Sequence, residues 1–399
     1  MADKDPDEVL YARATYGKEE KRAVQEVLEN PEALVGGDKT DAFEQAIADL
    51  FGKKHGIMVN SGSSALTLGI ECLQLPEQGE VITPLLTFST TVAPIVQNDL
   101  VPVFVDVKMG SYQIDPDLVE SAVTDDTVAL MVPSLIGNIP DLKRLRDIAK
   151  EHNLYLIEDS ADTVGATIDG EPTGTYTDVS TTSFYGSHII TGFGGGGMVC
   201  VNEDEHKNLA KKLRGWGRRS AVDETESIDE RLNADLNGIT YDHKFIFDEI
   251  GYNFHPIEAS AAFGLEQLDK LDAFSNQREA NFEAFRDFFA QYEDLFILPE
   301  QRENVHTNWM AYPVTLTEDA PFDRNDLVKH LEQNNIQTRS FWSGNITRHP
   351  ALDDVEYRVK GDSTVADYVM ENSFVLGCHQ GMGEREVEYV TQTIADFLD

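Results

Sequence analysis

The stretch SFYGSHIITGFGGGGMV, residues 183–199, places a histidine between two apolar segments that have the pattern of strands. His188 stands five residues after Ser183, and a run of glycines follows it. An imidazole exchanges protons near neutral pH, so His188 suits general acid–base chemistry. It does not form the stable Schiff base that a lysine amine forms. A single histidine is often structural, so the neighbouring motifs decide how His188 is interpreted.

One of these motifs could hold a phosphate. NSGSSAL, residues 60–66, lies between a predicted strand and a predicted helix. Free backbone amides at a helix start, together with the hydroxyls of Ser63 and Ser64, can bind such a group. Ser183, in the histidine stretch, could reach the same phosphate. Taken alone, the motif is equally well explained as an ordinary helix N-cap.

Two further residues suit a flat, protonated ring. Asp159, in LIEDSAD at 156–162, ends a predicted buried strand, where α/β sheets bind their ligands. Its carboxylate could pair with a protonated pyridine nitrogen and keep the ring an electron sink. Phe88, in LLTFSTTVAP at 85–94, could stack on the ring. Each alone has a simpler explanation, a loop aspartate and a core phenylalanine, but the set fits a pyridoxal-type cofactor.

A sheet must bring these motifs to one edge. Short apolar segments alternate with amphipathic helical patterns such as 63–75 and 141–153, which predicts an α/β layer with a mostly parallel sheet. We expect about seven strands, at residues 55–60, 80–84, 101–107, 127–135, 154–159, 179–185 and 197–202.

The rest of the chain predicts a second, smaller α/β unit. Residues 257–292 keep helical periodicity and predict one or two long helices, whereas the acidic segment 218–243 predicts a long surface loop. We divide the chain into an N-terminal arm with a large cofactor-binding domain, 1–270, and a small C-terminal domain, 271–399. In the latter we expect strands at 311–316 and 336–342 and helices at 324–335 and 384–398.

The composition is that of a globular and strongly acidic protein. Of 399 residues, 41% are hydrophobic, and 71 acidic against 32 basic residues give a formal charge of −39. Such a surface repels nucleic acid and anionic membranes, so neither is expected as a partner. The acids are spread over the whole chain, which suits a halophilic source with a cytoplasm of high salt. No apolar stretch has transmembrane length and the acidic N-terminus has no signal-peptide core, so a cytoplasmic location is expected.

In this order and spacing, the motifs resemble the sugar aminotransferase family named after DegT, DnrJ, EryC1 and StrS. The resemblance runs from ATYGKEEKRAVQEVLE (14–29) to the C-terminus. It implies the fold of aspartate aminotransferase, which is fold type I of the transferases dependent on pyridoxal 5′-phosphate (PLP), and a homodimer. The family's lysine falls at His188 here. The family's GEGG reads FGGGG, so Gly194 stands near the usual glutamate and the stretch is one residue longer.

The histidine resembles one branch of that family, the 3-dehydratases of nucleotide-linked 4-keto-6-deoxyhexoses. YDHKFIFDEIGYNFHPIEASAAFGLEQL (241–268), SGNITRHP (343–350) and LGCHQ (376–380) are similar to that branch. The resemblance carries over, residue by residue, to the catalytic pair Tyr185 and His188, the ring partners Phe88 and Asp159, and the phosphate-binding Gly62, Ser63, Ser64, Ser183 and, from a second subunit, Asn253.

The activity implied by the resemblance is removal of the sugar's 3-hydroxyl with pyridoxamine 5′-phosphate (PMP), formed from PLP by an amino donor such as glutamate. With His188 in place of the family's lysine, the site keeps a base but lacks the nucleophilic amine that would pass the amino group onward. A relative that acts on CDP-sugars holds an iron–sulfur cluster on four cysteines and receives electrons from a reductase. Cys72, Cys200 and Cys378 are too few for that cluster, so neither a metal nor a reductase partner is expected.

The nucleotide-sugar substrate carries a negatively charged diphosphate, so a strongly acidic chain needs basic residues at the site to bind it. Five basic residues near the motifs are predicted for its diphosphate, although surface ion pairs would also explain them: Arg218, Arg219, Lys244, Arg339 and Arg348. Two other functions remain open from the sequence. One is a nucleotide-sugar aminotransferase that uses a histidine, and the other is an inactive relative that binds a nucleotide sugar.

Overall fold

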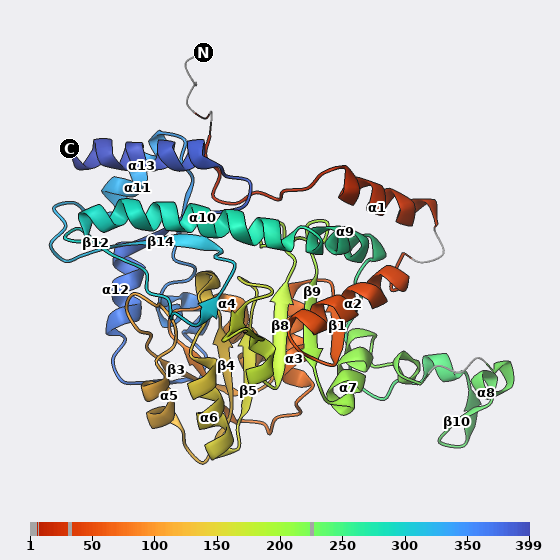
Figure 1. Cartoon of the computed structure of the whole chain (residues 1–399). Helices are drawn as coiled ribbons and strands as arrows, with labels where there is room; N and C mark the ends of the chain where they lie inside the picture. Colours follow the sequence, from red (N-terminus) through yellow and green to blue (C-terminus); the bar gives the residue numbers. More distant parts are fainter. Residues whose placement is uncertain (1–5, 7, 31–33, 224–226) are drawn as a thin grey trace.

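An eight-stranded sheet forms the centre of the protein (Figure 1). The computed structural model describes residues 6, 8–30, 34–223 and 227–399. The prediction that the N-terminus is not a signal peptide concerns residues that lie largely outside these ranges. Residues 224–226 of the predicted surface loop also lie outside them. Across the sheet the strands are ordered β1 (His55–Val59), β9 (Gly197–Val201), β8 (Val179–Ser183), β5 (Tyr155–Asp159), β4 (Thr127–Pro133), β2 (Glu80–Pro84), β3 (Val101–Val105) and β16 (Arg358–Lys360).

The seven predicted strands are all present, and the mostly parallel character of the sheet is confirmed. β8, β5, β4, β2, β3 and β16 pair in parallel, whereas β9 is antiparallel to both β8 and β1. The eighth strand, β16, was not predicted because it is only three residues long and comes from the C-terminal part of the chain.

Helices cover both faces of the sheet, because the side chains of its strands are apolar on both faces. In β1, Ile57 and Val59 pack on one face and Met58 on the other. The face of Ile57 is covered by α3 (Gly62–Glu71), α4 (Ser89–Gln97) and α7 (Asp204–Arg214). The opposite face is covered by α5 (Pro116–Ala122), α6 (Leu142–His152), α2 (Asp38–Leu50) and α9 (Glu258–Leu268).

A second sheet is built from the C-terminal part of the chain, where a smaller α/β unit was predicted, and its strands pair antiparallel. It comprises β12 (Phe296–Ile297), β14 (Ala311–Leu316), β17 (Ser373–Gly377) and β15 (Thr338–Ser340). Its helices are α10 (Leu271–Phe289), α11 (Arg324–Gln333), α12 (Thr364–Asn372) and α13 (Glu384–Leu398). Buried side chains from both parts share one hydrophobic core, in which Phe282 stacks on Trp309 with ring centroids 3.8 Å apart. The domain division at residue 270 stays a prediction.

The long helical stretch predicted at 257–292 forms two successive helices, α9 and α10. Figure 1 shows α10 crossing above the sheet, with the N-terminal helix α1 (Lys18–Glu29) beside α9. Ala23 and Val27 of α1 pack on Ala262 of α9. Among the described residues, no helix is long and apolar enough to cross a membrane.

The segment predicted as a long surface loop, 218–243, has more regular structure than expected. It contains α8 (Ile228–Leu232) and a hairpin of β10 (Ala234–Leu236) and β11 (Ile239–Tyr241), and it extends away from the sheet beyond α7 (Figure 1). Asn237 and Gly238 adopt φ of 54° and 85°, the left-handed conformation that a tight hairpin turn requires. The Asn-Gly pair is a strong hairpin signal that the acidic composition obscured.

Candidate active site

The histidine stretch is the connection between two antiparallel neighbours, because β8 ends at Ser183 and β9 begins at Gly197. Phe184 N–H donates to the Gly196 carbonyl at 2.9 Å and continues their pairing. A Cβ on Gly197 would lie 2.3 Å from the Ser61 carbonyl oxygen. The glycine at this position therefore allows the hairpin to lie directly against the turn that starts α3.

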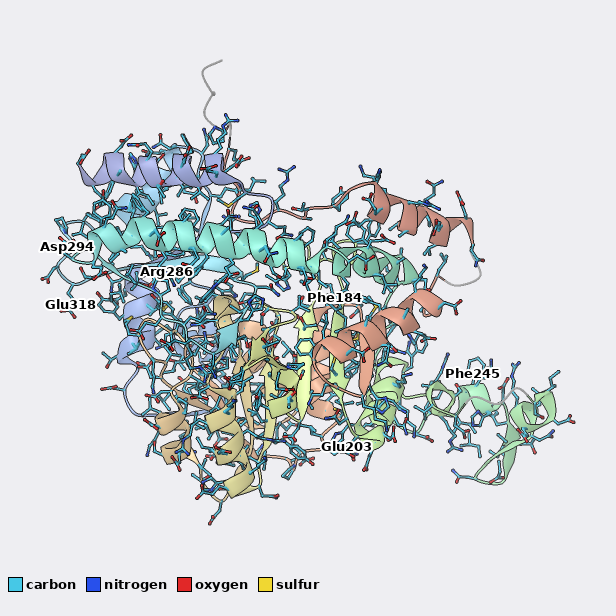
Figure 2. The ribbon with its side chains drawn as sticks, in the orientation of Figure 1. Phe184, Glu203, Phe245, Arg286, Asp294 and Glu318 are labelled. Atoms are coloured by element: carbon cyan, nitrogen blue, oxygen red, sulfur yellow. The ribbon has the colours of Figure 1, made fainter. Side chains whose placement is uncertain are left out.

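This connection lies at the edge of the sheet where the parallel strands end. Figure 2 shows Phe184 at the end of β8 nearest α10 and Glu203 at the opposite end of the sheet. β5 runs parallel to β8, so Asp159 at its end reaches the same edge as Ser183. Ligands of α/β sheets bind at such an edge.

A cavity of about 440 Å³ opens there. This volume is in the range of small-molecule and cofactor sites. The structure brings seven predicted site residues together in its lining: Gly62, Ser63, Phe88, Asp159, Ser183, Tyr185 and His188. It does not place the other predicted residues in the lining, namely Ser64, Asn253, Arg218, Arg219, Lys244, Arg339 and Arg348.

The imidazole of His188 is oriented by the strand that it follows. Its Nδ1 lies 3.3 Å from the Ser183 carbonyl oxygen, which only accepts, so Nδ1 carries the proton of the neutral ring and Nε2 is basic. Burial lowers the pKa of His188 to about 4, the Ser183 carbonyl opposes this shift, and the positive charge of Arg278 adds to it. His188 is therefore neutral at pH 7 and can accept a proton. The exposed Tyr185 ring stands edge-on to it, with centroids 6.0 Å apart.

Asp159 is held rigidly at the end of β5. The Thr91 hydroxyl donates to its Oδ2 at 2.7 Å, and Ala161 N–H donates to its Oδ1 at 3.1 Å. Burial raises the pKa of Asp159, and the two hydrogen bonds oppose that rise. A buried carboxylate of this kind gains from a cationic partner such as a protonated ring nitrogen. Phe88, at the start of α4, is 47% exposed and so offers a free ring surface to the cavity.

The other end of the cavity is suited to a phosphate. The first backbone N–H groups of α3 have no acceptor within the helix. A Cβ on Gly62 would lie 2.5 Å from the Ser183 Cβ, so the glycine lets this helix start approach Ser183. Ser61 is the N-cap and accepts from Ser64 N–H at 3.1 Å. The Ser64 hydroxyl donates to Asn60 Oδ1 at 2.7 Å, which occupies it within the turn.

Sequence reasoning missed several lining residues, among them Tyr11, Trp342 and Asp162. Tyr11 comes from the segment before α1, and Trp342 follows β15, so both reach the cavity from distant parts of the chain without a local motif. Asp162 lies within the quoted LIEDSAD motif, but only its burial sets it apart. Its Oδ2 accepts Ile136 N–H at 2.9 Å, and burial together with the charge of Asp159 raises its pKa to about 8.

The predicted cations differ in their partners. Arg219 donates twice to Asp248, at 3.0 and 2.8 Å, and Arg348 pairs with Asp367. The Arg218 guanidinium lies 4.4 Å from the centroid of the Trp216 ring, among exposed aromatic side chains.

Arg339 is the predicted cation with a contact to the cavity wall, because its guanidinium lies 5.3 Å from the centroid of the Tyr11 ring. The Lys244 backbone N–H donates to Asp242 at 3.0 Å. Asn253 is exposed and pairs through its backbone with Gly215. Among the described residues, no group of histidine, cysteine and carboxylate side chains could hold a metal ion.

The sheet, the edge and the cavity define an α/β enzyme of fold type I, the PLP-dependent class. The DegT/DnrJ/EryC1/StrS aminotransferase family matches residues 14–395, and the chain belongs to that family. The resemblance and the fold class predicted from the sequence are thereby confirmed.

Individual relatives carry the names of 3-dehydratases. The dTDP-4-dehydro-2,6-dideoxy-D-glucose 3-dehydratase of Saccharopolyspora spinosa is 39% identical over 379 residues, which cover 92% of this chain and 81% of that protein. The structure of E. coli GDP-4-keto-6-deoxy-D-mannose-3-dehydratase with bound hydrated PLP has a TM-score of 0.89 at 28% identity and covers 98% of this chain and 100% of that one. A GDP-4-keto-6-deoxymannose-3-dehydratase with a trapped PLP-glutamate geminal diamine has a TM-score of 0.87 at 28% identity, with coverage of 96% and 99%.

Proposed function

We propose that this protein is a PLP/PMP-dependent 3-dehydratase that removes the 3-hydroxyl of a nucleotide-linked 4-keto-6-deoxyhexose for 3,6-dideoxysugar biosynthesis. It works without an iron–sulfur cluster. The observation that carries the proposal is His188, a neutral base with a free Nε2, in a cavity whose described lining residues include no lysine. Relatives named as 3-dehydratases of two different nucleotide sugars support it.

The residues present fit the cofactor. Asp159 is a buried carboxylate that would hold a protonated ring nitrogen, and Phe88 would cover one face of the ring. Ser63, Ser183 and the start of α3 would hold the phosphate. When bound, the cofactor supplies the electron sink for breaking the carbon–oxygen bond.

His188 performs the proton transfers. Ser183 fixes its Nδ1–H, so Nε2 accepts a proton in the cavity and can return it to the departing hydroxyl. An imidazole cannot hold the cofactor or the substrate through a stable Schiff base. The described lining residues include no lysine that could recapture the cofactor and complete an amine transfer. This difference favours loss of the hydroxyl over transfer of nitrogen to the sugar.

The rest of the proposal concerns the substrate, the donor and the assembly. Glutamate is the proposed amino donor, and a homodimer in the cytoplasm is the proposed working form, with the exposed Asn253 reaching the second subunit's phosphate site. Arg339 is the preferred ligand for the diphosphate, because Arg219 and Arg348 already pair with carboxylates. No reductase partner is required.

The test is product analysis on the purified protein in high salt with PLP and glutamate. GDP-linked and dTDP-linked 4-keto-6-deoxyhexoses are supplied in parallel, and the sugars are followed by mass spectrometry together with an ammonia assay. Loss of the 3-hydroxyl with ammonia release, without a reductase, is the expected result. An amino sugar would instead make the protein an aminotransferase, and PLP absorbance without any product would make it an inactive relative. The His188→Asn variant is the control, and it should bind PLP without turnover.

A further inference from the structure

Arg278 is a buried cation without an acidic partner. It lies on α10, is 1% exposed, and among the residues that the structure describes no aspartate or glutamate forms an ion pair with it. Its acceptors are neutral. Nε donates to Gln380 Oε1 at 2.7 Å, and Nη1 donates to the carbonyls of Trp309 and Met310 at 2.9 and 3.3 Å. A buried charge paired only with dipoles costs stability, so a fold that retains one invites a functional explanation.

Its hydrogen bonds lead to the wall of the cavity. Met310, whose carbonyl Arg278 holds, lines the cavity directly. Gln380, whose side-chain oxygen Arg278 holds, donates its Nε2–H to the Ile189 carbonyl at 3.2 Å. Ile189 is the neighbour of His188 in sequence, so one guanidinium connects α10 to the turn that carries the imidazole.

The loop that contains Gln380 is itself fixed by α10. Asn281, three residues after Arg278, donates to the carbonyls of Cys378, His379 and Met382 at 3.3, 3.1 and 3.4 Å. The connection from Arg278 through Gln380 to the histidine turn is therefore held at both ends and is not a chance surface contact.

We propose that Arg278 is a positioning residue for His188, which fixes the histidine turn through Gln380 and supplies the positive charge behind the cavity. The proposal rests on the role of His188 as the base in the proposed function. It concerns a residue that touches neither cofactor nor substrate, so it acts only through its neighbours.

Other groups face His188, and their charges decide whether Arg278 dominates. They are Tyr185 and the Ser183 carbonyl from the connection after β8, Asp159 and Asp162 from β5 and the loop after it, and Tyr11 from the N-terminal segment, all of which line the cavity with His188. His379, from the loop after β17, lies within electrostatic reach of Arg278. Burial raises the pKa of Asp159 and, together with the charge of Asp159, that of Asp162 to about 8, and burial lowers the pKa of His379 to about 4. Asp162 and His379 are therefore largely uncharged at pH 7. Burial also lowers the pKa of Arg278, but only to about 10, so it keeps its full charge at neutral pH.

The test is the titration of His188 in cofactor-free protein by NMR of ¹³C-labelled histidine, with the His188→Asn variant to assign the signal. In the wild type, His188 should stay neutral from pH 8 to pH 5. Arg278→Met should move its titration upward by about one pH unit, because a like charge is removed. Arg324→Met is the matched control, since Arg324 also donates to backbone carbonyls, those of Met370 and Ser373, but neither of these acceptors lines the cavity as Met310 does.

Two variants of Gln380 test separately the electrostatic effect of Arg278 on His188 and the positioning of the histidine turn. They can be measured even if Arg278→Met does not fold. Gln380→Glu places a carboxylate against the guanidinium and should raise the His188 titration in the same direction. Gln380→Leu keeps the charge, so the titration should stay low while turnover falls about tenfold from the loss of one hydrogen bond to the turn.

An unchanged His188 titration in both Arg278→Met and Gln380→Glu would refute the claim that the charge of Arg278 affects His188. Full turnover in Gln380→Leu would refute the claim that Gln380 positions the histidine turn. The NMR readout needs neither cofactor nor substrate. Its failure is therefore distinct from a failure of the dehydratase assay.

Discussion

Asp162 offers a quantitative test of the electrostatics in the cavity wall. Its side chain is buried, it accepts one hydrogen bond from Ile136 N–H, and burial with the nearby Asp159 raises its pKa from 3.8 to about 8. The substitution Asp162→Asn keeps an acceptor oxygen for Ile136 and removes the titration. We expect this variant to be more stable than the wild type at neutral and alkaline pH.

The expected magnitude follows from proton linkage. Because the folded pKa is raised, the folded state is favoured fully only below pH 3.8 and loses stability as the pH rises toward 8. With 1.36 kcal/mol per pKa unit, the ionisation available to the unfolded chain costs about 2 kcal/mol at pH 5 and about 5 kcal/mol at pH 8. The gain in unfolding free energy of Asp162→Asn over the wild type should therefore grow by about 3 to 4 kcal/mol between these two pH values.

The assay is urea unfolding of the cofactor-free protein at pH 5, 6.5 and 8 in one fixed salt concentration. Asp178→Asn is the control with the opposite sign. Asp178 accepts from Arg146 at 2.8 and 2.7 Å and has a lowered pKa, so its stabilisation is lost only below pH 3.8. Asp178→Asn should therefore be less stable than the wild type by an amount that stays constant between pH 5 and 8. An Asp162→Asn variant whose stability relative to wild type does not change with pH would refute the reasoning.

Three further outcomes are expected. With a His188 pKa of about 4, kcat/KM should change by less than about 5% between pH 8 and 6. If the base were an ordinary histidine of pKa 6.5, kcat/KM would fall about fourfold over that range, and a pH–rate profile distinguishes the two cases. Thr91→Val removes the 2.7 Å hydrogen bond to Asp159 and should raise the Kd for PLP about tenfold in an absorbance titration, without changing the unfolding transition greatly. Phe282→Ala removes the ring stacked on Trp309 and should lower the unfolding free energy by about 3–5 kcal/mol in urea, and a loss below 1 kcal/mol would contradict the packing.

Local pattern was sufficient to predict the main sheet and much of the cavity. The seven strands are short apolar runs separated by segments with helical periodicity. Strands that pair in parallel end at the same edge of the sheet, and this does not depend on the order in which they are connected. Asp159 and Ser183 follow from that rule, because each ends a strand at this edge. Gly62 and Phe88 stand where helices begin after strands, so their places follow from the same rule.

Other features depend on contacts that no local pattern records. Tyr11 and Trp342 reach the cavity only through tertiary packing of distant segments. Arg278 lies in a helix whose periodicity gives no reason to expect a buried cation, and its link to His188 passes through Gln380, about a hundred residues further along the chain. The hydroxyl of Ser64 was assigned to the phosphate from its residue type, whereas the structure engages it with Asn60.

Asp162 in the cavity wall and Arg278 behind it are two buried ionisable groups that form no ion pair with each other. Asp162 and Arg278 both influence the pKa of Tyr11, in opposite directions, so the tyrosine lies within electrostatic reach of both, yet the two do not pair with each other. A salt bridge between them would relieve both burial costs and would stabilise the fold. It would also neutralise the field at His188 and remove a proton that Asp162 can hold near neutral pH. Burial is the larger cause of the low His188 pKa, and the unpaired charge of Arg278 adds to it at a cost in stability, which is the kind of local conflict expected near a functional site.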